Sequence, residues 1–193
     1  SGKALITRGL GNNRSLSDAQ AERIADELSA LKKEFPKQEA ALDKEIYKAK
    51  NLTIGRQAPE IEGVDVDGVS FKLSDYRGKV VVIDFWGDWC PPCRAMYPHE
   101  RSLVKELENE SFALLGVNSD KKDRVQKAMK KENITWRSFW DGGNTRGPIA
   151  TRWGVTGWPT VYVLDHEGKV RYQGTRGDDM TRVVKHLLAE MKK

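Results

Sequence analysis

The sequence predicts an α/β fold in which helices flank a mixed central sheet, preceded by a helical extension. Two almost continuous apolar runs, at residues 80–86 and 112–117, are typical of strands that are buried on both faces. Segments with apolar residues at helical spacing alternate with such strands, and this order favours helices on both sides of one sheet. With 193 residues and 38% hydrophobic residues, the chain can bury the core of one domain and carry an appendage.

The appendage is expected at residues 1–51. Residues 1–15, with several Gly and Asn, indicate a flexible lead-in. Ser17 and Gln20 have the spacing of a capping box, and apolar residues then recur at helical spacing as far as a proline. A second helix is expected at residues 37–50. Two short amphipathic helices cannot bury their apolar stripes alone, so we expect them to cap the main domain; a second copy or upstream sequence are the alternatives.

The main domain is expected at residues 52–193. Its elements are predicted from strand alternation, turn-forming residues and helical periodicity. A hairpin, a βα alternation, a second hairpin and a final helix are expected. In detail, the expected strands are 61–64, 69–73, 80–86, 112–117, 134–139, 160–164 and 169–173, and the helices run from the cysteine motif to about 109 and over 120–132, 148–153 and 178–191. Pro98 is the place where the first of these helices is expected to bend.

Charge and hydropathy patterns argue against two functional classes. The net charge of +5, from 33 basic and 28 acidic residues, is spread along the chain, so we expect no nucleic-acid partner. The densest basic stretch, residues 121–131, is interpreted as the solvated face of a helix. We also expect no membrane-spanning segment, because no apolar run approaches the ~20 residues that cross a bilayer, and the N-terminus lacks the layout of a signal peptide.

The chain has two cysteines, Cys90 and Cys93, and they form a Cys-Pro-Pro-Cys motif between a predicted strand and helix. This spacing on the first helical turn brings the two sulfurs together, so that a disulfide can form and break. Cys90 at the N-cap faces the positive end of the helix dipole and is the expected nucleophile, whereas Cys93 is the expected resolving thiol. A structural disulfide and half of a zinc site are the alternatives. The three histidines are scattered singly, so no metal ion or other cofactor is expected.

The intervening prolines bear on redox strength. Pro91 at the first helical position costs nothing, because that N–H has no helical partner. Pro92 removes a donor that could have reached the Cys90 thiolate, which leaves mainly the N–H of Cys93. A less stabilised thiolate favours a reductant or an exchange catalyst over a strong oxidant.

Several segments resemble the thioredoxin superfamily. Residues 82–93, Val-Ile-Asp-Phe-Trp-Gly-Asp-Trp-Cys-Pro-Pro-Cys, resemble its active-site strand and helix, and residues 157–160, Gly-Trp-Pro-Thr, resemble its cis-proline segment. Residues 54–59 and 73–79 resemble the TlpA/ResA-like branch with its AhpC/TSA-related lead-in, as does an inserted helix and strand at about 120–139. The resemblance implies a thioredoxin-like fold, thiol-disulfide oxidoreductase activity, and a bacterial extracytoplasmic setting, either periplasmic or membrane-anchored.

The resemblance also implies roles for residues outside the motif. Asp84 matches the family's buried acid, and within an apolar strand its carboxyl group should be desolvated, with a raised pKa suited to exchanging the proton of Cys93. A solvated Asp84 at the end of the strand is the alternative. Many relatives carry a Glu between the second cysteine and the next proline, whereas residues 94–98 here contain no acid.

Aromatic residues around the implied substrate site form the last part of the expectation. Pro159 is implied to be cis and adjacent to the disulfide, where the backbone of Trp158 would pair with an extended substrate. Trp158 is bulkier than the usual residue, so we expect an aromatic lip formed by Trp86, Trp89 and Trp158. Ordinary packing of these rings is the alternative.

The leading hypothesis is a thiol-disulfide oxidoreductase that reduces or exchanges disulfides in protein substrates and is served by a membrane or soluble thiol electron donor. A peroxiredoxin-like peroxidase is disfavoured, because no Pro-x-x-x-Thr/Ser-x-x-Cys pattern occurs. A thioredoxin-fold binding module of a larger envelope protein, joined through residues 1–51, is the second alternative.

Overall fold

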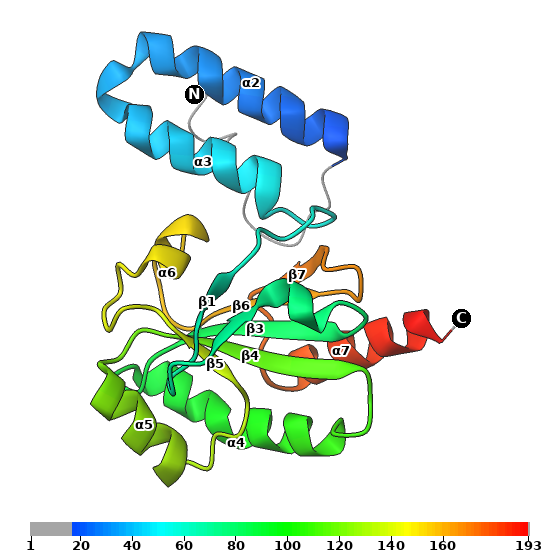
Figure 1. Ribbon diagram of the computed structural model, residues 1–193. Coiled ribbons are helices and arrows are strands. Elements are labelled where there is room, and N and C mark those ends of the chain that lie inside the picture. Colours follow the sequence, from blue (N-terminus) through cyan, green and yellow to red (C-terminus); the bar gives the residue numbers. More distant parts are fainter. Residues whose placement is uncertain (1–16, 193) are drawn as a thin grey trace.

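The computed structural model describes residues 17–192, so the lead-in expected at residues 1–15 lies outside the described part (Figure 1). Its centre is a five-stranded sheet in the order β5-β4-β3-β6-β7. β3 is parallel to β4, β4 is parallel to β5, and β6 is antiparallel to both β3 and β7. The strands are β3 (Val80–Trp86), β4 (Phe112–Asn118), β5 (Ser138–Trp140), β6 (Thr160–Leu164) and β7 (Val170–Gln173). The expected mixed sheet is confirmed.

The core lies in two layers, one on each face of the sheet. Side chains alternate along β3, so Val82 and Trp86 enter one layer, whereas Ile83 and Phe85 enter the other. The first layer is covered by α4 (Pro91–Glu106), α5 (Lys122–Lys131) and α7 (Gly177–Met191). The second is covered by α6 (Pro148–Arg152), η2 (Leu73–Tyr76) and a separate antiparallel hairpin of β1 (Glu62–Val64) and β2 (Ser70–Lys72).

β5 and α5 begin later than the sequence predicts. β5 begins only at Ser138, although Ile134 and Trp136 before it are 5% and 4% exposed. These side chains are buried in the core although their segment is irregular. Because burial alone requires apolar residues, the segment has the apolar spacing of a strand without pairing as one. The helix expected from residue 120 begins at Lys122, because Asp120 is bonded to the loop that follows β3.

The N-terminal extension forms two antiparallel helices, α2 (Asp18–Glu34) and α3 (Glu39–Asn51), joined by η1 (Pro36–Gln38). The capping box of Ser17 and Gln20 is confirmed. The pair contacts the main domain near the end of α3, where Leu52 is 2% exposed and Tyr47 Oη accepts a hydrogen bond of 3.1 Å from Arg152 Nε. The pair thus contacts the main domain on the side of α6, away from α4 (Figure 1), and the division at residue 51 stays a prediction.

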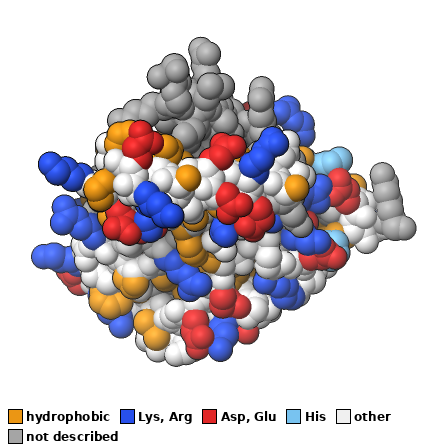
Figure 2. All heavy atoms as spheres, turned by 90° about the horizontal axis from the view of Figure 1, so that it is seen from above, with side chains coloured by type: hydrophobic (Ala, Val, Ile, Leu, Met, Phe, Trp, Pro, Cys, Tyr) orange, Lys and Arg blue, Asp and Glu red, His pale blue; other side chains and the backbone are white. Residues whose placement is uncertain are grey.

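Surface charge is mixed on the face that carries the helical pair. Figure 2 shows basic and acidic side chains interspersed over it. Ion pairs such as Lys32 with Asp43 and Lys50 with Glu22 account for part of this pattern. Among the described helices, none combines the length and the apolar character needed to cross a membrane.

Candidate active site

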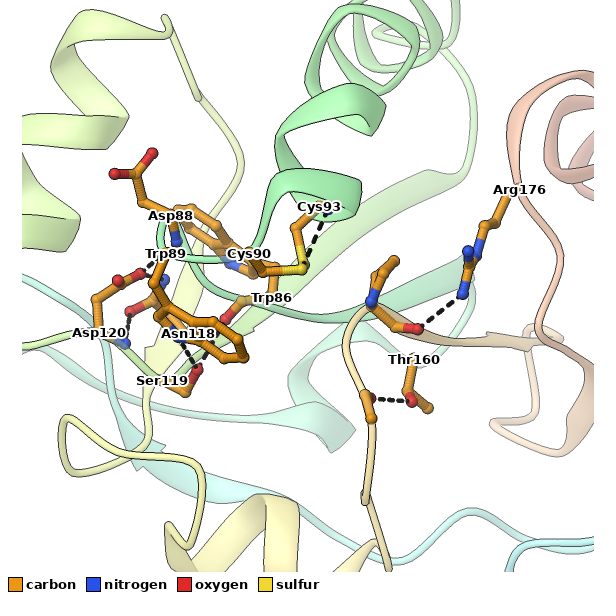
Figure 3. The surroundings of a disulfide bond; sticks show 12 residues. Trp86, Asp88, Trp89, Cys90, Cys93, Asn118, Ser119, Asp120, Thr160 and Arg176 are labelled. Atoms are coloured by element: carbon orange, nitrogen blue, oxygen red, sulfur yellow. Dashed lines mark hydrogen bonds between the residues drawn. A yellow bond between two sulfur atoms is a disulfide. The ribbon is translucent and has the colours of Figure 1, made fainter.

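The two cysteines lie where β3 passes into α4. Cys90 is the N-cap of α4, and its sulfur forms a disulfide with the sulfur of Cys93 (Figure 3). The Cα atoms of the two cysteines are 5.3 Å apart. The Sγ of Cys90 accepts a hydrogen bond of 3.3 Å from the backbone N–H of Cys93. Pro91 and Pro92 occupy the two positions between them and supply no donor. The first turn of the helix therefore offers one backbone N–H to the sulfur of Cys90.

The loop between β3 and Cys90 is hydrogen-bonded to the residues that follow β4. Trp89 Nε1 donates to Ser119 Oγ at 3.2 Å, and the N–H of Asp88 donates to Asp120 Oδ2 at 2.7 Å (Figure 3). Because β3 and β4 are parallel, their carboxyl ends meet at one edge of the sheet. Ser119 and Asp120 were not singled out from the sequence, and their position directly after a buried strand was the signal available.

Two of the three tryptophans expected at the aromatic lip lie at the surface beside the disulfide loop. Trp89 is 40% exposed, and its ring centroid is 5.8 Å from that of half-buried Trp158, at an interplanar angle of 58°. Trp86 is only 1% exposed; its Nε1 donates to Ser138 Oγ and its ring packs edge-on against Tyr97. The expectation that Trp86 belongs to the lip is wrong, because Trp86 points into the layer beneath α4.

The proline segment before β6 is held from the far end of the chain. The Trp158–Pro159 peptide bond is cis. The carbonyl oxygen of Pro159 accepts a hydrogen bond of 3.0 Å from Arg176 Nη2, and Thr160 Oγ1 donates to the carbonyl of Gly157 at 2.7 Å (Figure 3). Sequence reasoning missed Arg176, since an arginine in a loop before a helix carries no signal of its own.

Two buried carboxyl groups, those of Asp84 and Glu100, lie close to each other. Asp84 in β3 is 1% exposed, and Glu100 in α4 is 0% exposed. Burial raises the pKa of Asp84 to about 7, although its hydrogen bond with Glu100 and the charge of Arg176 act in the opposite direction. Burial, the charge of Asp84 and their mutual hydrogen bond raise the pKa of Glu100 well above its ordinary value.

Glu100 is a buried acid beside Asp84 that sequence reasoning missed. Residues 94–98 lack the acid that many relatives carry there, and the remainder of the helix, where α4 places Glu100 near Asp84, was not considered from the sequence. The signal was present in the helical spacing, because Glu100 follows Cys93, Met96 and Tyr97 on the buried face of the helix.

Comparisons with known proteins show what this chain is similar to. The model of the AhpC/TSA family matches residues 54–173. Thiol-disulfide oxidoreductase ResA of Geobacillus thermodenitrificans is 31% identical over 121 residues, which cover 62% of this chain and 68% of that protein. ResA of Bacillus thuringiensis subsp. konkukian is 28% identical over 145 residues, covering 75% of this chain and 82% of that protein.

Solved structures show the same likeness. The thioredoxin domain of a thiol-disulfide oxidoreductase from Bacteroides vulgatus is 28% identical and superposes with a TM-score of 0.66, covering 72% of this chain and 99% of that one. A secreted thiol-disulfide isomerase from Corynebacterium glutamicum is 25% identical with a TM-score of 0.61, covering 68% and 84%.

Proposed function

Because this chain belongs to the AhpC/TSA family, we propose that it reduces or exchanges the disulfide bonds of protein substrates through its Cys-Pro-Pro-Cys motif. It is a thioredoxin-like thiol-disulfide oxidoreductase of the TlpA/ResA type. One observation carries the finer proposal: the disulfide of Cys90 and Cys93 lies at the start of α4, and an exposed tryptophan adjoins it.

In this proposal, Cys90 is the attacking thiol. As the N-cap of α4, its thiolate would be stabilised by the helix dipole and by the N–H of Cys93. Its attack on a substrate disulfide forms a mixed disulfide and releases one substrate thiolate. Cys93 then attacks the sulfur of Cys90, closes the protein disulfide and releases the second substrate sulfur. The protein dithiol is oxidised and the substrate disulfide is reduced.

Substrate contacts are assigned to the surface beside the disulfide. The exposed ring of Trp89, together with Trp158, would cover an apolar part of an extended substrate. The backbone of Trp158, before Pro159, would pair with the substrate main chain. The bond from Arg176 to the carbonyl of Pro159 supports this role, since it holds the segment in place.

The setting and the partners are proposed from the relatives. An extracytoplasmic location agrees with the secreted isomerase among the structural neighbours. A membrane or soluble thiol protein would return electrons to the disulfide of Cys90 and Cys93, because each turnover with a substrate disulfide leaves the protein oxidised.

The test combines turnover with trapping. The reduced full chain should reduce insulin disulfides, and Cys93→Ala should accumulate a mixed disulfide with the substrate through Cys90. Cys90→Ala is the matched control, in which no mixed disulfide is expected. The proposal would be contradicted if the wild type did not reduce insulin and the Cys93→Ala variant trapped no mixed disulfide.

A further inference from the structure

We propose that Glu100 is a positioning residue for disulfide exchange: its carboxyl group shares one proton with the carboxyl group of Asp84, and this pair exchanges protons with Cys93. The inference rests on the proposed function and extends it to a residue outside the cysteine and proline motifs. Three observations carry it: the face of the sheet that Asp84 occupies, the place of Glu100 on α4, and the shortage of donors around both.

Asp84 lies on the same face of the sheet as the core layer that contains Cys93. Side chains alternate along β3, and its neighbours at two residues' distance, Val82 and Trp86, belong to the core layer that contains Cys93. The residue opposite Asp84 on β6, Val161, belongs to the same layer. The carboxyl group of Asp84 therefore lies in the layer between the sheet and α4.

Glu100 occupies the place of a core residue on α4. It follows Cys93 by seven residues, which is two helical turns along the same face, and Met96 and Leu103 are buried on that face as well. An apolar side chain would fill this place without cost, whereas an unpaired buried carboxylate costs several kcal/mol. The chain thus carries an acid where packing alone favours a leucine, and this points to a part in the reaction.

The surroundings of Asp84 and Glu100 favour a state in which the two carboxyl groups hold one proton between them. Within residues 17–192, Asp84 Oδ1 and both carboxyl oxygens of Glu100 have no hydrogen-bond donor, yet the two side chains lie within hydrogen-bonding reach of each other. Two carboxylates only accept, so the bond between them exists only when one carboxyl group holds a proton. Two negative charges in contact also repel strongly in a low-dielectric interior. The pair therefore carries one proton and one negative charge around neutral pH.

Few charged groups surround the pair. Arg176, before α7, lies close enough for its charge to favour ionised Asp84. Tyr97 on α4 stays neutral, because burial and the nearby carboxylates raise the pKa of its hydroxyl group. β4 contributes Gly116 opposite Asp84 and so adds no side-chain charge there. His99, the neighbour of Glu100 on α4, is bonded through Nε2 to a hydroxyl group of α7, whose buried side chains are otherwise apolar.

A singly protonated pair can both accept and donate. The first substrate sulfur leaves as a thiolate and takes a proton from water, while the pair accepts the proton of the Cys93 thiol. The Cys93 thiolate then forms the disulfide with Cys90. The second substrate sulfur leaves and takes the proton back from the pair. Two electrons have passed from the protein dithiol to the substrate, and the pair has returned to its starting state.

The test is the pH dependence of disulfide exchange in the full chain with Glu100→Gln. Glutamine keeps the size of the side chain and a hydrogen bond to Asp84, but it cannot ionise. Between about pH 5 and about pH 10, the exchange rate of the wild type should show two ionisations of the pair. The variant should show only one, and its midpoint should differ from both wild-type midpoints by at least about one pH unit, which is a tenfold change in proton affinity. Glu106→Gln, an exposed glutamate on the same helix, should keep the wild-type profile.

A second measurement needs no variant. In reduced wild-type protein labelled with carbon-13 at carboxyl carbons, the signals of Asp84 and Glu100 should each respond to both ionisations, because a shared proton belongs to the pair. Two carboxyl carbons that titrate independently would overturn the inference.

Two further outcomes separate the possible failures. If Glu100→Leu, which fills the same space, keeps the wild-type pH profile, Glu100 only packs and the inference is wrong; the same holds for an unchanged profile in Glu100→Gln. If the wild type fails to reduce insulin and Cys93→Ala traps no substrate, the proposed function fails instead.

Discussion

Arg176 Nη2 donates a hydrogen bond of 3.0 Å to the carbonyl oxygen of Pro159, so a residue just before α7 holds the segment proposed to pair with substrate. The same guanidinium group favours the ionised form of Asp84. One side chain thus connects the proposed substrate-binding backbone with Asp84, the acid proposed to exchange protons with Cys93.

Replacing this arginine should weaken substrate binding. Arg176→Gln loses a charge-assisted hydrogen bond worth at most about 1.5–3 kcal/mol, and since Arg176 is largely exposed we expect the lower end, up to about tenfold in KM for insulin. Steady-state kinetics of insulin reduction check this expectation. Arg182→Gln, an exposed arginine on α7, serves as the control, and equal KM values in both variants would speak against the role of Arg176.

The buried acid should make stability fall as pH rises. The pKa of Asp84 is raised to about 7 in the folded protein, so the folded state binds a proton more tightly than the unfolded state does. The stabilisation is fully present below the unfolded pKa and is lost as the pH rises through about 7, with a slope of at most ~1.4 kcal/mol per pH unit per proton.

Urea denaturation of reduced wild type and Asp84→Asn at a series of pH values measures this effect. The asparagine variant should lose the part of the decline that Asp84 causes, while Glu100 still ionises, and so should gain stability relative to wild type between about pH 4 and about pH 8. Asp178→Asn, an exposed substitution, should follow the wild-type curve. Parallel curves for wild type and Asp84→Asn would rule out a raised pKa for Asp84.

Restoring a backbone donor should make the protein more oxidising. Pro92→Ala returns an N–H to the second position of α4, from which an N-cap side chain can accept a hydrogen bond. A hydrogen bond to a charged group contributes about 1.5–3 kcal/mol, which corresponds to a rise of roughly 30–60 mV in reduction potential.

Redox equilibration with glutathione measures this potential. Pro91→Ala is the matched control, because an N–H at the first helical position does not reach the N-cap side chain. A potential for Pro92→Ala equal to that of wild type would show that the Pro92 position does not set the stability of the Cys90 thiolate.

The exposed tryptophan should matter for protein substrates and not for small ones. Trp89→Ala removes the aromatic surface beside the disulfide, a contact worth about 1 kcal/mol, so KM for insulin should rise roughly fivefold. Reduction of hydroxyethyl disulfide, which is too small to reach both Cys90 and the ring, should be unchanged. Trp89→Phe, which keeps a ring and loses only the bond to Ser119, should retain most of the affinity. An equal effect of Trp89→Ala on both substrates would indicate a disturbed disulfide loop instead.

Local patterns were sufficient for much of the fold. β3 and β4 were predicted because each is buried on both faces, and the capping box marked the start of α2. The same reasoning failed at β5, where Ile134 and Trp136 are buried without pairing in a strand. Apolar spacing reports burial, and burial alone does not distinguish a strand from an irregular segment packed against the core.

By itself, the sequence determined the pieces of this protein whose chemistry is local: the paired thiols at a helix start, the prolines between them, and an acid within an apolar strand. Only the tertiary structure decided which residues meet them. Arg176 is 17 residues from Pro159, and Ser119 is 30 residues from Trp89, so these partners depend on how β4, β6 and α7 pack around β3. Glu100 joins Asp84 for the same reason. A long-range contact leaves no periodic trace in a single chain, because either partner alone is an ordinary polar residue.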